Sequence, residues 1–224
     1  MLCTSTYPLF HKLRFSMKHI LVVAVVWFVA IDVTQQYCSQ FGRQHLQHQC
    51  VLTPESVEGP FYLDDQLIRR DIREDRQGLP LKLRLTLTDV NTCEPLSNVS
   101  IDVWQCDAIG DYSGYIHANI TRWGHAKTID NTRWLRGIQM TDKNGVAEFM
   151  TVFPGWYSGR ATHIHILSHT GNRTIHTGQL YFPEEMLKRI DRLYPYNTTK
   201  SRRQTNEKDR LYRKFKGANS MLAK

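Results

Sequence analysis

The chain has 224 residues, of which 41% are hydrophobic and 22% are charged, an ordinary composition for a globular protein with one sizeable core. Its formal net charge is +8 at pH 7, and the basic excess is concentrated in residues 201–203 and 208–216. A basic segment can attract nucleic acid, but the sequence contains no helix-turn-helix, zinc-finger or RRM pattern. We therefore interpret this segment as a solvated surface and expect no nucleic-acid partner.

Residues 17–31, MKHILVVAVVWFVAI, have the form of a secretory signal. Lys18 provides a positive charge near its start, an apolar core follows, and polar residues come after the core. The apolar run is too short for a comfortable membrane span, so we predict a secreted, extracellular protein with no membrane anchor. Met17 as the initiator and a longer segment starting at Met1 both fit the pattern. Residues 1–36 are therefore assigned to the signal peptide and the segment before it.

Secretion makes the remaining cysteines candidates for disulfides. An even number stays in the mature chain and suits two bridges: Cys38, Cys50, Cys93 and Cys106. The three possible pairings remain open, although a Cys93–Cys106 bridge is disfavoured if a tight hairpin separates the two residues. Four N-glycosylation sequons also fit an extracellular route. They begin at Asn98, Asn119, Asn172 and Asn197.

Short segments in which apolar and polar residues alternate follow along the chain, and this period of two predicts strands with one buried face. They are residues 81–88, 99–104, 146–153, 162–167 and 174–182. Residues 110–136 are rich in Gly, Asn, His and Trp and are expected to form a long loop near a site. A short helix is expected from Glu184. The pattern predicts an all-β protein: a β-sandwich core with long irregular loops and a short C-terminal helix, in one domain over residues 37–200 with a basic tail over 201–224.

Two histidines fall two residues apart in one of these strands. His163 and His165 project to the same side of the strand, which suits two imidazoles on one metal ion. An HxH pair alone is weak evidence, because a structural pair on a strand is the more frequent case. Tyr157, beyond a Pro-Gly turn, and Tyr112, after a predicted strand, are candidate partners, since a phenolate oxygen favours a trivalent ion. Tyr115 as the functional tyrosine, and plain core roles for these aromatics, stay open.

Four segments occur in consistent order over roughly residues 50–183. They are LTPESVEGPFY (52–62), DVWQCDAIGDYSGY (102–115), WLRGIQMTDKNGVAEFMTVFPGWYSGRATHIHI (134–166) and HTGQLYF (176–182). Each motif is modest alone, but together they are highly specific, and the chain resembles the intradiol ring-cleavage dioxygenases. The similarity is to the secreted single-domain forms of fungi and plant-feeding mites. The β-sandwich fold of that family agrees with the strand pattern.

The resemblance implies a non-haem Fe(III) centre. Its ligands would be Tyr112, Tyr157, His163 and His165, and Tyr157 would leave the metal as the substrate binds. Arg160 and Gln179 would stabilise charge on the bound aromatic ring, while Val57 and Pro60 would line the substrate pocket. The implied reaction uses O2 to cleave a catechol-type ring between its two hydroxyl-bearing carbons, giving a cis,cis-muconate-type diacid.

The resemblance also bears on substrate and assembly. Plant or environmental catecholic polyphenols are the expected substrates of a secreted enzyme of this kind. The helical N-terminal region with which larger bacterial relatives dimerise is lacking, so a monomer is expected. The alternative is a non-catalytic extracellular β-sandwich that binds small aromatics, or that binds copper or zinc through the HxH pair.

Overall fold

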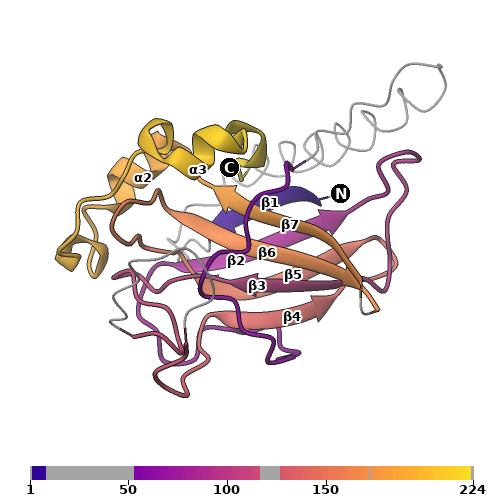
Figure 1. Cartoon of the computed structure of the whole chain (residues 1–224), viewed down its shortest axis with the longest axis horizontal. Helices are drawn as coiled ribbons and strands as arrows, with labels where there is room; N and C mark the ends of the chain where they lie inside the picture. The colour runs from indigo at the N-terminus through magenta and orange to yellow at the C-terminus, as the bar shows by residue number, and fades with distance from the viewer. Residues whose placement is uncertain (1, 9–52, 117–126, 172, 223–224) are drawn as a thin grey trace, which may run out of the picture.

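The computed structural model describes residues 2–8, 53–116, 127–171 and 173–222, and these residues form two antiparallel sheets (Figure 1). The first sheet has the order β1 (Leu2–Pro8), β2 (Pro80–Leu87) and β5 (Val146–Val152). The second has the order β4 (Arg136–Met140), β3 (Ser100–Trp104), β6 (His163–Thr170) and β7 (Arg173–Tyr181). The prediction of an all-β sandwich is confirmed.

Strand β2 illustrates how the alternating pattern builds the core. Leu83 and Leu85 are completely buried, while Arg84 between them keeps 46% of its side chain exposed. One hydrophobic cluster joins both sheets, and its members include Leu83, Leu85, Phe149, Val103, Ile164 and Ile166. The period of two in the sequence thus decides which face of each strand enters the sandwich.

Replacing Leu85 by alanine should lower the free energy of unfolding by about 2–5 kcal/mol, because a buried leucine leaves a cavity that its neighbours fill only in part. Urea unfolding followed by tryptophan fluorescence measures the change. The matched control is Arg84→Ala on the opposite face of the same strand, which should cost less than about 1 kcal/mol. Equal losses for the two variants would contradict the assignment of the buried face.

Two strands lie where the sequence pattern did not indicate them. Strand β4 begins at Arg136, at the end of the segment expected to be a long loop. Strand β1 pairs with β2 from Leu2 to Pro8, in the segment expected to precede the signal peptide. The apolar signal-like segment, residues 17–31, lies outside the described residues, as do Cys38 and Cys50.

Cys106 does not take the role that the cysteine count suggested. It is a free thiol with 1% of its surface exposed, so the Cys93–Cys106 bridge is not formed and the expectation of a disulfide at Cys106 is wrong. The reason is its position two residues after the end of β3, where it packs in an aromatic cluster with Trp104 and Tyr112. Burial raises the pKa of this thiol well above its usual value.

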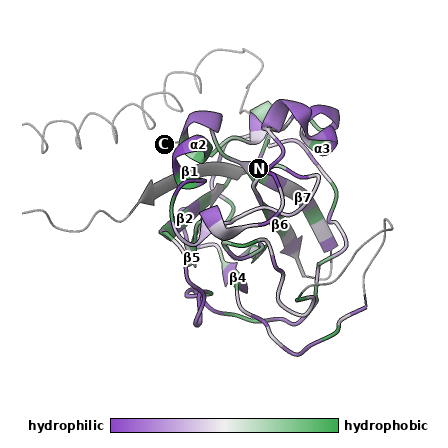
Figure 2. Ribbon diagram, turned by 90° about the vertical axis from the view of Figure 1, so that its left-hand side faces the viewer, coloured by the Kyte–Doolittle hydropathy of each residue, from purple (hydrophilic) through white to green (hydrophobic). Residues whose placement is uncertain are grey.

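The C-terminal part of the chain is folded against the second sheet. Helix α2 (Glu184–Ile190) begins at the residue where a short helix was expected, and α3 (Arg210–Lys214) follows. Both ribbons are mainly hydrophilic and lie on the same side of the molecule (Figures 1 and 2). The segment expected to be a solvated basic tail nevertheless buries Leu211 and Leu222, because apolar residues are spaced among its charges.

Three short 3-10 turns accompany these helices: η1 (Tyr196–Thr198), η2 (Asn206–Lys208) and η3 (Gly217–Ser220). The last of them contacts β7, and a parallel bridge joins Tyr181 to Met221. None of the helices in the described ranges has the length and apolar character that a bilayer crossing requires.

Candidate metal centre

His163 and His165 lie at the start of β6, on the face opposite to the isoleucines that enter the core. Both are buried, and their Nε2 atoms are 3.0 Å apart. The Nδ1 of His163 donates a hydrogen bond to the carbonyl oxygen of Ala161 (2.7 Å), which leaves its Nε2 as the acceptor nitrogen. The two imidazoles therefore converge on one point, as the spacing in the sequence predicts.

The surroundings keep these imidazoles neutral. Burial lowers the pKa of both histidines well below the usual value, and the charge of Arg160 acts in the same direction. The ring of Trp104 stacks on that of His165, with centroids 4.8 Å apart. Since neutral imidazole is the form that binds a metal, the pair is ready to act as two nitrogen ligands at neutral pH.

Tyr112 and Tyr157 border the same space. The ring centroid of Tyr112 is 5.8 Å from that of Tyr157 and 6.1 Å from that of His165, and Tyr157 lies 5.8 Å from His163. The hydroxyl of Tyr112 is buried and has no hydrogen-bond partner among the described residues, an uncommon state for a buried polar atom. Burial raises the pKa of Tyr112 well above its ordinary value, so a nearby cation is needed to make it a phenolate.

Tyr115, the alternative functional tyrosine, faces a different group of residues. Its hydroxyl donates to the carbonyl oxygen of Tyr62 (3.5 Å), and the guanidinium of Arg136 lies 5.8 Å from its ring centroid. Phe61 lies between the two tyrosines of this segment: it stacks on Tyr112 at 4.3 Å and meets Tyr115 edge-on. The geometry thus favours Tyr112 as the partner of the histidines.

A glycine allows the two tyrosine-bearing segments to meet. Gly110 has a φ of +98°, and a Cβ at this position would lie 2.1 Å from the carbonyl oxygen of Trp156, so a side chain is excluded. The backbone N–H of Gly155 donates to the carbonyl of Asp107 (3.0 Å), which ties the same two segments together. This close approach places Tyr112 beside Tyr157, although 45 positions separate them in the chain.

Arg160 connects the two tyrosines and two histidines of the candidate site to Gln179. One guanidinium nitrogen, Nη1, donates to the hydroxyl oxygen of Tyr157 (3.2 Å), and Nη2 donates to the Oε1 of Gln179 (2.6 Å). Gln179 stands directly opposite His165 in the pairing of β6 with β7, so both side chains lie on one face of the sheet. The amide Nε2 of Gln179 donates to the carbonyl of Val57 (3.0 Å), which brings the predicted pocket residue Val57 to the same network.

The segment that contains Pro60 passes over the histidines. At Gly59, with a φ of +84°, a Cβ would lie 3.2 Å from the Cε1 of His165. Phe61 on the other side of Pro60 stacks on Tyr112. Both neighbours of Pro60 therefore touch the cluster, and all eight predicted site residues belong to one part of the molecule.

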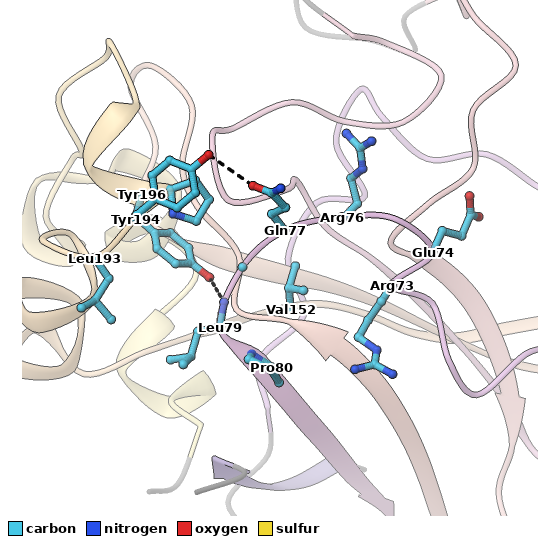
Figure 3. A pocket seen from close by; sticks show the side chains of 12 residues that line it. Arg73, Glu74, Arg76, Gln77, Leu79, Pro80, Val152, Leu193, Tyr194 and Tyr196 are labelled. Atoms are coloured by element: carbon cyan, nitrogen blue, oxygen red, sulfur yellow. Dashed lines mark hydrogen bonds between the residues drawn. The ribbon is translucent and has the colours of Figure 1, made fainter. Parts of the chain in front are cut away.

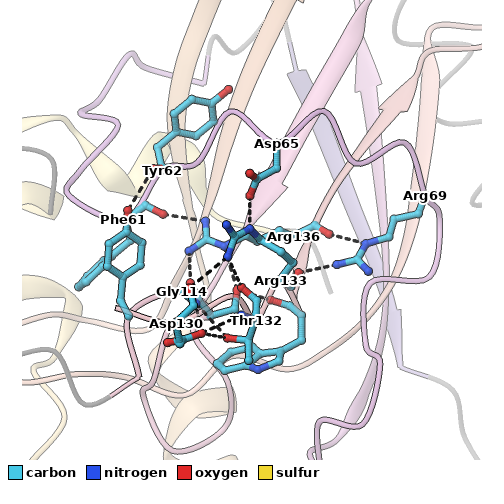
Figure 4. Close-up of polar contacts among 12 residues, drawn as sticks. Phe61, Tyr62, Asp65, Arg69, Gly114, Asp130, Thr132, Arg133 and Arg136 are labelled. Atoms are coloured by element: carbon cyan, nitrogen blue, oxygen red, sulfur yellow. Dashed lines mark hydrogen bonds and ion pairs between the residues drawn. The ribbon is translucent and has the colours of Figure 1, made fainter. Parts of the chain in front are cut away.

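A buried arginine holds together the segments around the tyrosines of the candidate site (Figure 4). Arg136, at the start of β4, is 4% exposed. It donates to the hydroxyl and the carbonyl oxygen of Ser113 (2.8 and 2.7 Å) and to the carbonyl of Phe61 (2.7 Å). Burial lowers its pKa to about 10. Arg136 thus links β4 to the two segments that hold Tyr112 and Phe61.

The side chains at the centre fit a ferric ion. Two neutral imidazoles lie there beside the rings of two tyrosines, and an orphaned buried phenol is satisfied once a cation shares its oxygen. Within the described ranges, no group of three or more His, Cys, Asp or Glu side chains is arranged to hold a metal. The donor set is thus a mixed imidazole–phenol set, the type for which we expected Fe(III).

Sequence reasoning missed two contributors to this site. Asp209 accepts a hydrogen bond from the Nε of Arg160 (2.9 Å), but it lies 49 residues downstream in a basic segment that gave no signal. Arg136 lies within the motif of residues 134–166, yet only its burial shows that it links neighbouring segments of the site.

A separate open groove is lined by residues that include Leu193, Tyr194 and Gln77, and it contains none of the predicted site residues (Figure 3).

Comparison with solved structures places these features in context. The chain is similar to an intradiol ring-cleavage dioxygenase from Tetranychus urticae, with 40% identity and a TM-score of 0.74 over 77% of this chain and 86% of that one. A second solved dioxygenase is 38% identical, with a TM-score of 0.73 over 77% of this chain and 85% of that one. The dioxygenase domain of a carbohydrate-binding fusion protein from Streptomyces sp. SirexAA-E is 28% identical, with a TM-score of 0.51 over 71% of this chain and 82% of that one. No protein-family model and no curated protein matches the chain.

Fold and site together define a β-sandwich protein with a buried imidazole–phenol cluster, and the solved relatives of this class are dioxygenases. At 40% identity over most of both chains, the chain belongs to the intradiol ring-cleavage dioxygenases. The resemblance that the four motifs indicated, including the relation to mite forms, is thereby confirmed.

Proposed function

We propose that the protein is a non-haem Fe(III)-dependent dioxygenase that cleaves catechol-type rings between the two hydroxyl-bearing carbons. Tyr112, Tyr157, His163 and His165 would hold the iron. The observation that carries the proposal is the convergence of two neutral imidazole Nε2 atoms, 3.0 Å apart, next to a buried phenol without a hydrogen-bond partner among the described residues. When bound, Fe(III) would act as a Lewis acid toward both catechol oxygens and make the ring reactive toward O2.

The surrounding side chains have distinct tasks in this proposal. The Oη of Tyr157, held by Arg160 at 3.2 Å, would accept a proton from a catechol hydroxyl. Arg160 and Gln179, joined at 2.6 Å, would face the ring and stabilise the negative charge that develops on it. The segment from Val57 to Pro60, next to His165, would form one wall of the pocket. Tyr112, His163, His165 and Gln179 are buried, and the low polarity of their surroundings would strengthen each of these electrostatic effects.

The cellular setting is part of the same proposal. We infer secretion from the signal-like segment, and the exposure of Asn98 and Asn197 supports N-glycosylation of these two sequons. The sequons at Asn119 and Asn172 lie outside the described residues. We further propose a monomer that acts on plant or environmental catecholic polyphenols, and the membership of the chain in the intradiol dioxygenase family supports the catecholic substrate class.

The direct test is a spectrum and a turnover assay on the purified protein. We expect about one iron per chain, a strong visible colour from the ferric tyrosinates, and oxygen uptake with catechol that yields cis,cis-muconate. Catechol, caffeate and bulkier catecholic polyphenols, compared side by side, would rank the substrates. A colourless iron-replete protein, or one that binds catechol without ring cleavage, would contradict the proposal; the latter would favour a non-catalytic binding protein.

A further inference from the structure

Asp209 is a completely buried carboxylate in the C-terminal segment, beyond the part of the chain that carries the family motifs. Its two oxygens bind different parts of the molecule. Oδ1 accepts from the backbone N–H groups of Leu211 (2.7 Å) and Tyr212 (3.2 Å), and so caps the start of α3. Oδ2 accepts from the Nε of Arg160 (2.9 Å) and from the backbone N–H of Ala161 (2.8 Å).

These contacts determine the orientation of the Arg160 guanidinium. The group is planar, so fixing Nε to Asp209 and Nη2 to Gln179 leaves Nη1 in one place. That place is 3.2 Å from the hydroxyl oxygen of Tyr157 and 3.4 Å from the Nε2 of His163. Asp209 therefore holds the Nε of Arg160, and this contact helps to direct Nη1 toward Tyr157 and His163.

Asp209 also supplies the negative charge that Arg160 needs. Only 11% of the arginine side chain is exposed, and Asp209 is its ion-pair partner. A buried guanidinium without a carboxylate would tend to move toward water or toward other acceptors.

We propose that Asp209 is a positioning residue for the ring-cleavage reaction: the C-terminal segment completes the active site by aiming Arg160 at Tyr157 and at the substrate ring. This inference rests on the proposed function. It gives the segment from residue 206 to 222 a role in the chemistry, although its composition resembles a basic tail.

The test compares two substitutions of Asp209 with a control substitution in α3, the helix that Asp209 caps. Asp209→Asn keeps one oxygen for the helix cap but presents an amide to the Nε of Arg160, and Asp209→Ser keeps a cap without reaching Arg160. Both should reduce kcat for catechol by about 10- to 100-fold, weaken anaerobic catechol binding, and shift the visible band of the substrate-free ferric protein, because Arg160 no longer donates to Tyr157. Leu211→Ala, which loosens α3 without touching Arg160, should lower the melting temperature and leave the band and kcat unchanged.

A double-mutant cycle decides whether Asp209 acts through Arg160. In an Arg160→Lys background, Asp209→Asn should change kcat by less than about twofold, because the group that it orients is already altered. Independent effects, with the two losses multiplying, would overturn the proposal, as would an unshifted band with wild-type kcat in both Asp209 variants. A wild-type protein without colour or ring cleavage would instead refute the proposed function, so the two failures are distinguishable.

Discussion

Replacing Tyr112 by phenylalanine should remove most of the visible colour of the iron-loaded protein and reduce catechol cleavage by more than about 100-fold, since even partners of metal ligands contribute 10- to 100-fold. The hydroxyl of Tyr112 is buried and has no hydrogen-bond partner among the described residues, so a bound metal is the group that it serves in our proposal. Its ring contacts with Phe61 survive the substitution. Absorbance, iron content and oxygen uptake measure the three consequences separately.

Tyr115→Phe is the matched control, three residues away in the same segment. Its hydroxyl donates to the carbonyl of Tyr62 at 3.5 Å, a long and replaceable hydrogen bond. This variant should keep the colour, the iron content and turnover within about twofold of wild type. If Tyr115→Phe lost the colour and Tyr112→Phe kept it, the tyrosine ligand would be wrongly assigned.

Replacing Arg136 by methionine should lower the free energy of unfolding by about 2–4 kcal/mol, because buried oxygens of Ser113 and Phe61 would lose their donors. Removal of a buried cation offsets part of this loss, which is why the expected value is below the sum of the separate hydrogen bonds. Urea unfolding measures the stability, and iron retention reports whether Tyr112 and Phe61 stay in place.

Arg70→Ala serves as the control for the loss of an arginine. Arg70 pairs with Glu148, and 56% of its side chain is exposed, so the expected cost is less than about 1 kcal/mol. A similar cost for the two arginines would contradict the structural role assigned to Arg136.

Local pattern was sufficient for strands β2, β3, β5, β6 and β7, and for the two histidines of the site. The alternation in β2 and β6 follows from burial of one face, and it places His163 and His165 side by side without any knowledge of the fold. Tyr112 and Tyr157 were candidates from the sequence, but choosing Tyr112 over Tyr115 needed the family resemblance, because the meeting of Tyr112 with Tyr157 depends on a backbone contact at Gly110. No periodic signal records such a contact between distant segments.

The parts that could not be predicted depend on tertiary packing. Asp209 lies in a segment whose charge suggested exposure, and its burial results from the docking of α3 beside Arg160. Cys106 was counted as a disulfide partner because the sequence shows the number of thiols and not their surroundings. Strand β4 is short and only partly buried, so it carries too little alternation to be recognised.

The pairing of β6 with β7 has a consequence for how the centre is assembled. His163 stands opposite Tyr181 and His165 opposite Gln179, and an irregularity in the pairing falls at Ser168 and His169, several residues beyond the ligands. A slip of one residue would turn both imidazoles into the sandwich interior and present isoleucines to the substrate. The bulge resists such sliding. The direction in which the two imidazoles point is therefore set by the alignment of β6 with its neighbouring strand.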